Sequence, residues 1–135
     1  MKRFLDSSVL VESCLSQSPR FAAADALVNA SDTCTSAHAL AEAYATMSGD
    51  ARLRIAPADA ARMVEDLSKA LSIEVLPAAA YQPLISAAPG NGIRGGMIYD
   101  ALHAQTARNS GCQEVYTLNV SHFKHVAPDL RIVGL

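Results

Sequence analysis

The stretch Phe4-Leu5-Asp6-Ser7-Ser8-Val9-Leu10-Val11 decides how this sequence folds. A short apolar run ends at an aspartate and two serines, after which apolar residues resume. This pattern predicts a buried strand that passes directly into a helix, with Asp6 at the junction. In open α/β sheets, sites lie beyond the carboxyl ends of the strands, so Asp6 is the first candidate for chemistry.

The same strand-to-helix step recurs further along the chain. Ser36 ends a β-like stretch at 33–36 and can cap a helix from Ala37 to about Gly49. Further strands are expected at 73–76, 115–118 and 131–133, and further helices at 21–30, 57–71, 81–87, 97–109 and 119–125. This alternation predicts an α/β fold with three layers, α/β/α, around a central parallel sheet, in a single domain that spans residues 1–135.

Length and charge limit the possible functions. A chain of 135 residues can bury roughly two-thirds of its unfolded surface around one core. Its formal net charge of −2 gives no overall attraction to nucleic acid, so an RNA contact would need a local cluster of Lys and Arg.

Compartment and cysteine chemistry also follow from the sequence. The charge at Asp6 interrupts any signal-peptide core, and no segment reaches the apolar length of a membrane span, so a cytoplasmic protein is expected. Cys14, Cys34 and Cys112 are widely spaced and odd in number. They are expected to be reduced and buried.

Three acidic residues, far apart in sequence, interrupt apolar surroundings: Asp6, Glu42 and Asp100. Each has a simpler explanation when taken alone. Asp6 could cap a helix, Glu42 could face solvent, and Asp100 could stabilise a helix N-terminus. Taken together at these topological positions, they form a site for a hard cation such as Mg²⁺ or Mn²⁺.

Four segments, in order, resemble the PIN-domain family, which includes the VapC toxins of bacterial toxin–antitoxin pairs. The first is 4–11, in which Ser8 matches a hydroxyl position two residues after the acid. Residues 36–42 resemble the second acidic segment of the family, and residues 98–102 resemble the third. Residues 117–123 resemble the fourth, which is usually Thr-x-Asp followed by Phe.

The fourth segment departs from the family pattern because Asn119 stands where aspartate is common. Its amide oxygen can accept a bond from a metal-bound water but brings no charge. An N-cap role before the next helix explains Asn119 equally well, and both roles can hold together. Thr117 alternates to the same side of the strand and is expected to orient a water or a phosphate.

The resemblance implies a Mg²⁺-dependent ribonuclease, for which Mn²⁺ can substitute, that hydrolyses RNA phosphodiester bonds. Asp6, Glu42 and Asp100 would hold the metal, while Ser8 and Asn119 would orient waters or substrate. The resemblance further implies a homodimer, and a VapB-type antitoxin that occupies the acidic cleft or its rim in a toxin–antitoxin hetero-oligomer.

A glycine-rich segment suggests a different function. Gly90-Asn91-Gly92-Ile93-Arg94-Gly95 has the GxGxxG spacing of a dinucleotide-binding turn, but that turn must follow a strand, and a helix is expected here. We interpret the segment as a flexible active-site loop from which Arg94 reaches a phosphate, with Arg108 and Lys124 as further candidates. An oxidoreductase built on this loop, or a binding module with a weakened site marked by Asn119, remain the rival functions.

The chain has four histidines: His38, His103, His122 and His125. They lack the partner spacing of a zinc site. His38 lies one turn before Glu42 and His103 about one turn after Asp100, so either could neighbour the site. Simple packing is the interpretation that we favour for both.

Overall fold

The computed structural model describes residues 2–135, which contain a five-stranded sheet with every neighbouring pair of strands parallel. Across the sheet the strands are β3 (Ser72–Glu74), β2 (Thr33–Ser36), β1 (Arg3–Leu5), β4 (Glu114–Tyr116) and β5 (Arg131–Val133). The first strand of the chain is therefore central. Leu5 pairs with Tyr116, so Asp6 and Thr117 leave the sheet beside each other.

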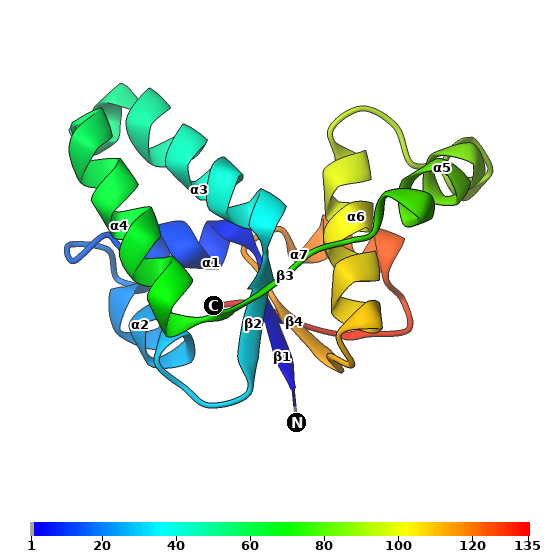
Figure 1. Ribbon diagram of the computed structural model, residues 1–135, viewed down its shortest axis with the longest axis horizontal. Helices are drawn as coiled ribbons and strands as arrows, with labels where there is room; N and C mark the ends of the chain where they lie inside the picture. The colour runs from blue at the N-terminus through cyan, green and yellow to red at the C-terminus, as the bar shows by residue number, and fades with distance from the viewer. Residues whose placement is uncertain (1) are drawn as a thin grey trace.

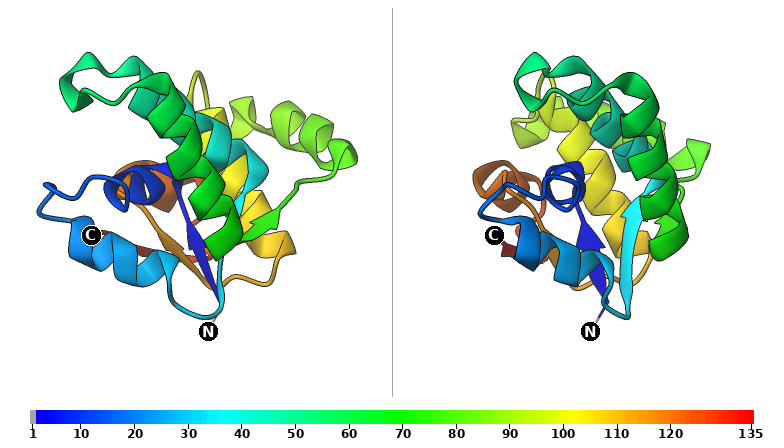
Figure 2. Two further views of the ribbon diagram at one scale, coloured as in Figure 1. Left: turned by 60° about the vertical axis from the view of Figure 1, so that its left-hand side comes forward. Right: turned by 90° about the vertical axis from the view of Figure 1, so that its left-hand side faces the viewer.

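Helices cover both faces of the sheet (Figure 1; Figure 2). One face carries α1 (Ser7–Glu12), α2 (Phe21–Val28), α3 (Ala37–Gly49) and α4 (Pro57–Ala70). The other carries α6 (Met97–Asn109) and α7 (Val120–Val126), with α5 (Ala78–Ala87) packed outside α6. The predicted three-layer fold with a parallel sheet is thus confirmed. Within residues 2–135, no helix has both the length and the apolar character needed to cross a membrane.

Two apolar clusters hold the layers together, and the alternation of strand residues assigns side chains to them. Leu5 faces the first cluster, where it packs with Val9 and Met47. Phe4 faces the second cluster, together with Phe123. The apolar stretch that opens the sequence therefore contributes to both faces of the sheet and fixes where Asp6 emerges.

The long helices have the predicted bounds, and the short elements differ from their predicted bounds. The helices at 37–49 and 97–109 are as expected, and Pro57 is the first residue of α4. The predicted strand at 73–76 ends at Glu74, and Val75 beyond it is 74% exposed. The predicted strand at 115–118 begins at Glu114 and ends at Tyr116, because the Leu118 N–H donates to the hydroxyl of Ser8 instead of to a strand.

The smaller helices and turns differ by a few residues. The helix expected at 21–30 ends at Val28, the one expected at 81–87 begins at Ala78, and the last helical turn covers Val120–Val126. Two short 3₁₀ segments, Ala51–Leu53 and Pro89–Asn91, lie in connections expected to be loops.

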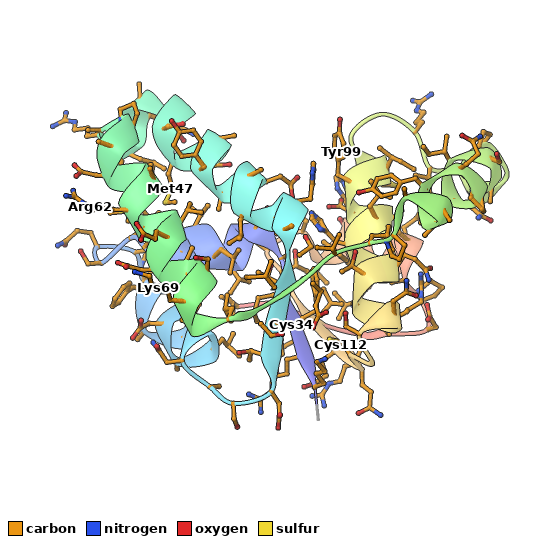
Figure 3. The ribbon with its side chains drawn as sticks, in the orientation of Figure 1. Cys34, Met47, Arg62, Lys69, Tyr99 and Cys112 are labelled. Atoms are coloured by element: carbon orange, nitrogen blue, oxygen red, sulfur yellow. The ribbon has the colours of Figure 1, made fainter. Side chains whose placement is uncertain are left out.

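The cysteines lie mainly in the interior, and all three are free thiols. Cys34 and Cys112 are buried side by side, with their sulfur atoms 3.2 Å apart (Figure 3). Cys14 is only partly buried, which corrects the expectation of burial for that residue, because it lies where the chain leaves α1.

Candidate metal centre

Side chains from three elements meet beyond the carboxyl end of the sheet. Asp6 follows β1, Glu42 lies in the second turn of α3, and His103 lies on α6. One potential ligand atom from each of these residues lies within 4.8 Å of the other two. The two carboxylates suit a hard divalent cation such as Mg²⁺ or Mn²⁺.

Asp6 is the most firmly held of these ligands. It is 2% exposed, and its Oδ2 accepts hydrogen bonds from Ser8 Oγ at 2.7 Å and from Thr117 Oγ1 at 2.8 Å. Among residues 2–135, no hydrogen bond reaches the second oxygen, Oδ1. Asp6 occupies the N-cap position of α1, but its side chain makes no capping hydrogen bond. Its carboxylate is therefore directed to the site.

Ser8 and Thr117 both support Asp6, and their expected contact with substrate or water stays a prediction. Besides donating to Asp6, Ser8 Oγ accepts a hydrogen bond from the Leu118 N–H at 3.0 Å. Thr117 Oγ1 accepts one from the Asn119 N–H at 2.9 Å, and Thr117 is fully buried. These two hydroxyls connect the first and fourth sequence segments and fix the orientation of Asp6.

Glu42 is held by a buried histidine. The Nε2 atom of His103 lies 2.5 Å from Glu42 Oε1, and its Nδ1 atom lies 3.0 Å from Ser36 Oγ. The hydroxyl of Ser36 also accepts the Ala39 N–H at 2.9 Å, as expected for the N-cap of α3. Burial favours a raised pKa for Glu42, but the hydrogen bond and charge of His103 outweigh it and hold the pKa below its usual value.

His103 is the residue that sequence reasoning missed. It is packed, as expected, with 1% exposure and its ring centroid 5.8 Å from that of Phe4, but it also belongs to the acidic cluster. Its position three residues after Asp100 placed it on the same helix face, which was the available signal. Leu102 and Ala104 flank it in sequence, and its ring lies near Phe4 of the central strand.

Asp100 lies beside the three-residue cluster but is not part of it. It is in the first turn of α6, with 13% of its side chain exposed and its Oδ2 atom 3.2 Å from Nδ1 of His122. Burial, followed by the charge of Asp6, raises the pKa of Asp100, although His103 and His122 act in the opposite direction. Asp6 and Asp100 are therefore close enough to repel each other.

Asn119 lies at the edge of this region. It is exposed and occupies the N-cap position of α7, but its side chain makes no capping hydrogen bond within the described part of the chain. The capping explanation is thus correct for the backbone position of Asn119 and wrong for its side-chain amide. A role of the amide at the metal site stays a prediction.

The three residues expected to contact phosphate have different surroundings in the structure. Arg94 is exposed in the loop before α6, and Lys124 is exposed on α7. Arg108 forms a two-pronged pair with Asp129, from Nε to Oδ2 at 2.8 Å and from Nη2 to Oδ1 at 2.7 Å. Arg108 also lies eight residues beyond Asp100, about 12 Å along the helix, so it is not a contact for phosphate at this site.

The glycine-rich segment lacks the setting of a dinucleotide-binding turn. It follows helix α5 rather than a strand, as the sequence predicted, and its first two residues lie in the 3₁₀ turn Pro89–Asn91. This placement removes the basis for the oxidoreductase alternative.

Comparison with solved structures shows the same fold at low sequence identity. DNA-bound VapBC from Salmonella typhimurium matches with a TM-score of 0.74 and 22% identity, covering 99% of this chain and 98% of that chain. VapBC2 from Rickettsia felis, bound to a promoter DNA fragment, matches with a TM-score of 0.71 and 19% identity, covering 100% and 99%. VapC20 from Mycobacterium tuberculosis, a toxin that cleaves the sarcin-ricin loop, has a TM-score of 0.68 and 20% identity, covering 84% and 87%.

Sequence comparison identifies the family. No curated protein matches this sequence significantly. The model of the PIN domain matches residues 3–128, which include Asp6, Glu42 and Asp100. The chain therefore belongs to the PIN-domain family.

Proposed function

We propose that this protein is a metal-dependent ribonuclease and the toxin of a VapBC-type toxin–antitoxin pair. One observation carries the proposal. Asp6, Glu42 and His103 converge within 4.8 Å at the carboxyl end of the sheet, and Asp100 lies close enough to Asp6 for their charges to interact. Such a concentration of acids is costly in a folded protein unless a cation balances it.

The residues present fit a divalent cation. Asp6 would offer Oδ1, Glu42 its carboxylate, and Asp100 would join from the first turn of α6. When bound, Mg²⁺ or Mn²⁺ would neutralise charge on the phosphate and generate a hydroxide nucleophile from water, so no protein nucleophile is required. Ser8 and Thr117 keep Asp6 in one orientation, and His103 does the same for Glu42.

His103 gives this site a feature that carboxylates alone would not supply. Its Nε2 atom can donate to Glu42 Oε1 and thereby hold the carboxylate in its ionised form, consistent with the lowered pKa of Glu42. The amide of Asn119 would orient a water or substrate oxygen at the exposed edge, and Arg94 would contact phosphate from its loop.

RNA and an antitoxin are the proposed partners. VapC20 is described as a toxin that cleaves the sarcin-ricin loop, and the Salmonella and Rickettsia neighbours are VapBC complexes. By analogy, we propose a VapB-type antitoxin that covers the acidic cluster, and a homodimer within a toxin–antitoxin hetero-oligomer.

Incubation of the purified protein with RNA tests the nuclease assignment. We expect cleavage with Mg²⁺ or Mn²⁺, none in excess chelator, and at least about a hundredfold loss in Asp100→Asn, because loss of a ligand exceeds the usual effect of its supporting groups. Asp66→Asn is the matched control, since Asp66 is exposed on α4. Cleavage that persists in chelator, or in Asp100→Asn, would contradict the proposal.

Asn119 supports one alternative, a PIN-like module that binds RNA or protein with little catalysis. It is exposed and brings no charge where the family commonly has aspartate. RNA binding by the wild type without cleavage under any divalent cation, together with cleavage by Asn119→Asp, would favour this alternative.

A further inference from the structure

We propose that Tyr99 and His38 form a stacking platform that binds one unpaired nucleobase of single-stranded RNA beside the acidic cluster. The inference rests on the proposed ribonuclease function and names the form of its substrate. Neither residue belongs to the candidate metal site, and neither was a predicted site residue.

The platform is an exposed pair of rings from two elements. Tyr99 precedes Asp100 at the start of α6 (Figure 3), and His38 lies in the first turn of α3. The two rings are stacked, with centroids 5.4 Å apart and an angle of 24° between their planes. Tyr99 nevertheless remains 47% exposed, and 45% of the His38 side chain is exposed. An aromatic surface is therefore held in place but not covered.

The position of the pair links it to the chemistry. Nε2 of His38 lies 4.0 Å from Oε2 of Glu42, and Tyr99 is bonded directly to Asp100 through the backbone. The platform thus borders both acids that come from the helices. A base stacked here would place its own sugar–phosphate linkage next to the cluster.

An exposed aromatic ring favours an unpaired nucleobase over a base in a duplex. Nucleobases stack on aromatic side chains only when they are not already stacked and paired in a duplex. Stacking accepts every base, since each has a π face, so the platform would position a strand without reading its sequence. It therefore favours loops and single strands over duplex RNA.

Binding measurements separate this proposal from the nuclease assignment. The probes are a short single-stranded oligoribonucleotide that contains 2-aminopurine and the same strand in a duplex, with Ca²⁺ in place of Mg²⁺ to slow cleavage. The full-length chain is compared with Tyr99→Ala, Tyr99→Phe and the control Tyr44→Ala. Tyr44 is 39% exposed on α3, but it lies two residues from Glu42 and so on a different face of the helix.

We expect Tyr99→Ala to weaken single-strand binding at least about fivefold and to lose the quenching of 2-aminopurine that stacking causes. Tyr99→Phe and Tyr44→Ala should stay within about twofold of wild type. Unchanged affinity in Tyr99→Ala, as expected if the pair instead contacts a protein, would overturn the platform, as would an equal loss for duplex and single strand. The nuclease assignment is judged separately, by metal-dependent cleavage in the wild type.

Discussion

Asp6 and Asp100 are the same amino acid at the edge of the same site, yet their surroundings differ. Asp6 is buried and accepts two hydroxyl hydrogen bonds, and both hydroxyls are themselves fixed by backbone N–H groups. Within residues 2–135, Asp100 has a single side-chain hydrogen-bond partner, His122, whose side chain is 52% exposed. The first carboxylate is oriented by the folded interior, and the second is only partly constrained.

The difference follows from the elements that carry the two residues. Asp6 leaves the central strand, which is paired on both sides. Asp100 lies in the first turn of a helix that follows a glycine-rich connection, in which Gly92 and Gly95 adopt positive φ angles of 68° and 59°. Only glycine adopts such angles without strain, so the connection depends on local backbone conformation rather than on the sheet. We infer that Asp6 forms the fixed side of the site and Asp100 its adjustable side.

The largest difference is expected when each aspartate loses its charge. In Asp6→Asn, Mn²⁺ should no longer raise the melting temperature, whereas Asp100→Asn should retain part of that increase. For the wild type, a hundredfold excess of Mn²⁺ over its Kd should contribute about 2.7 kcal/mol. Thermal unfolding with and without Mn²⁺ measures the effect. If Asp6→Asn and Asp100→Asn lose the same part of the melting-temperature increase caused by Mn²⁺, the two aspartates contribute equally to metal binding.

A smaller effect is expected when the support of Asp6 is removed. Thr117→Val deletes a buried hydroxyl that donates to Asp6 and accepts from Asn119, which should lower the free energy of unfolding by about 1–3 kcal/mol.

Thr106→Val is the control for this change. Thr106 is 3% exposed, but its hydroxyl bonds only to the Leu102 carbonyl one turn earlier in α6. We expect a loss of less than about 1 kcal/mol in urea unfolding, because no donor or acceptor is left without a partner. If the free energy of unfolding falls as much in Thr106→Val as in Thr117→Val, the hydroxyl hydrogen bonds around Asp6 do not stabilise the protein more than an ordinary buried hydroxyl does.

The smallest effect is expected at His122. The side chain of His122 is 52% exposed, so His122→Ala should change the free energy of unfolding by less than about 1 kcal/mol. Cleavage should fall less than about fivefold, which is the factor that corresponds to about 1 kcal/mol. Ser121→Ala, at an exposed position on the same helix, serves as the control. If His122→Ala loses as much cleavage activity as Asp100→Asn, Asp100 depends on His122 as strongly as Asp6 depends on its hydroxyl partners.

Local patterns were sufficient to predict the fold. The junction at Asp6 is visible because an apolar run stops at a charge, and α4 is visible because Pro57 begins a clean amphipathic repeat. The short strands were less well bounded. The strand expected from residue 115 begins one residue earlier, at Glu114, where Arg3 and Arg131 on the neighbouring strands compensate the buried charge.

The site was predictable only in part, because its supporting contacts span long distances in sequence. Asp6 and Glu42 could be paired by topology, but the partners of His103 lie 61 and 67 residues away. A histidine in an apolar stretch is usually just packed, and only the folded chain shows its two polar partners. The support that Ser8 and Thr117 give to the site was not foreseen for the same reason, since both hydroxyls bind partners about 110 positions distant.

The central position of β1 has a consequence for the timing of assembly during synthesis. Thr117 follows Asp6 by 111 positions, so its hydroxyl bond to Asp6 cannot form until translation has passed that point. At about 5–20 residues per second, that interval lasts roughly 6–22 s. Throughout it, the first strand lacks its neighbour β4, and the acidic cluster lacks one side of its framework. A nascent chain of this protein therefore carries Asp6 and Glu42 well before it carries an assembled site.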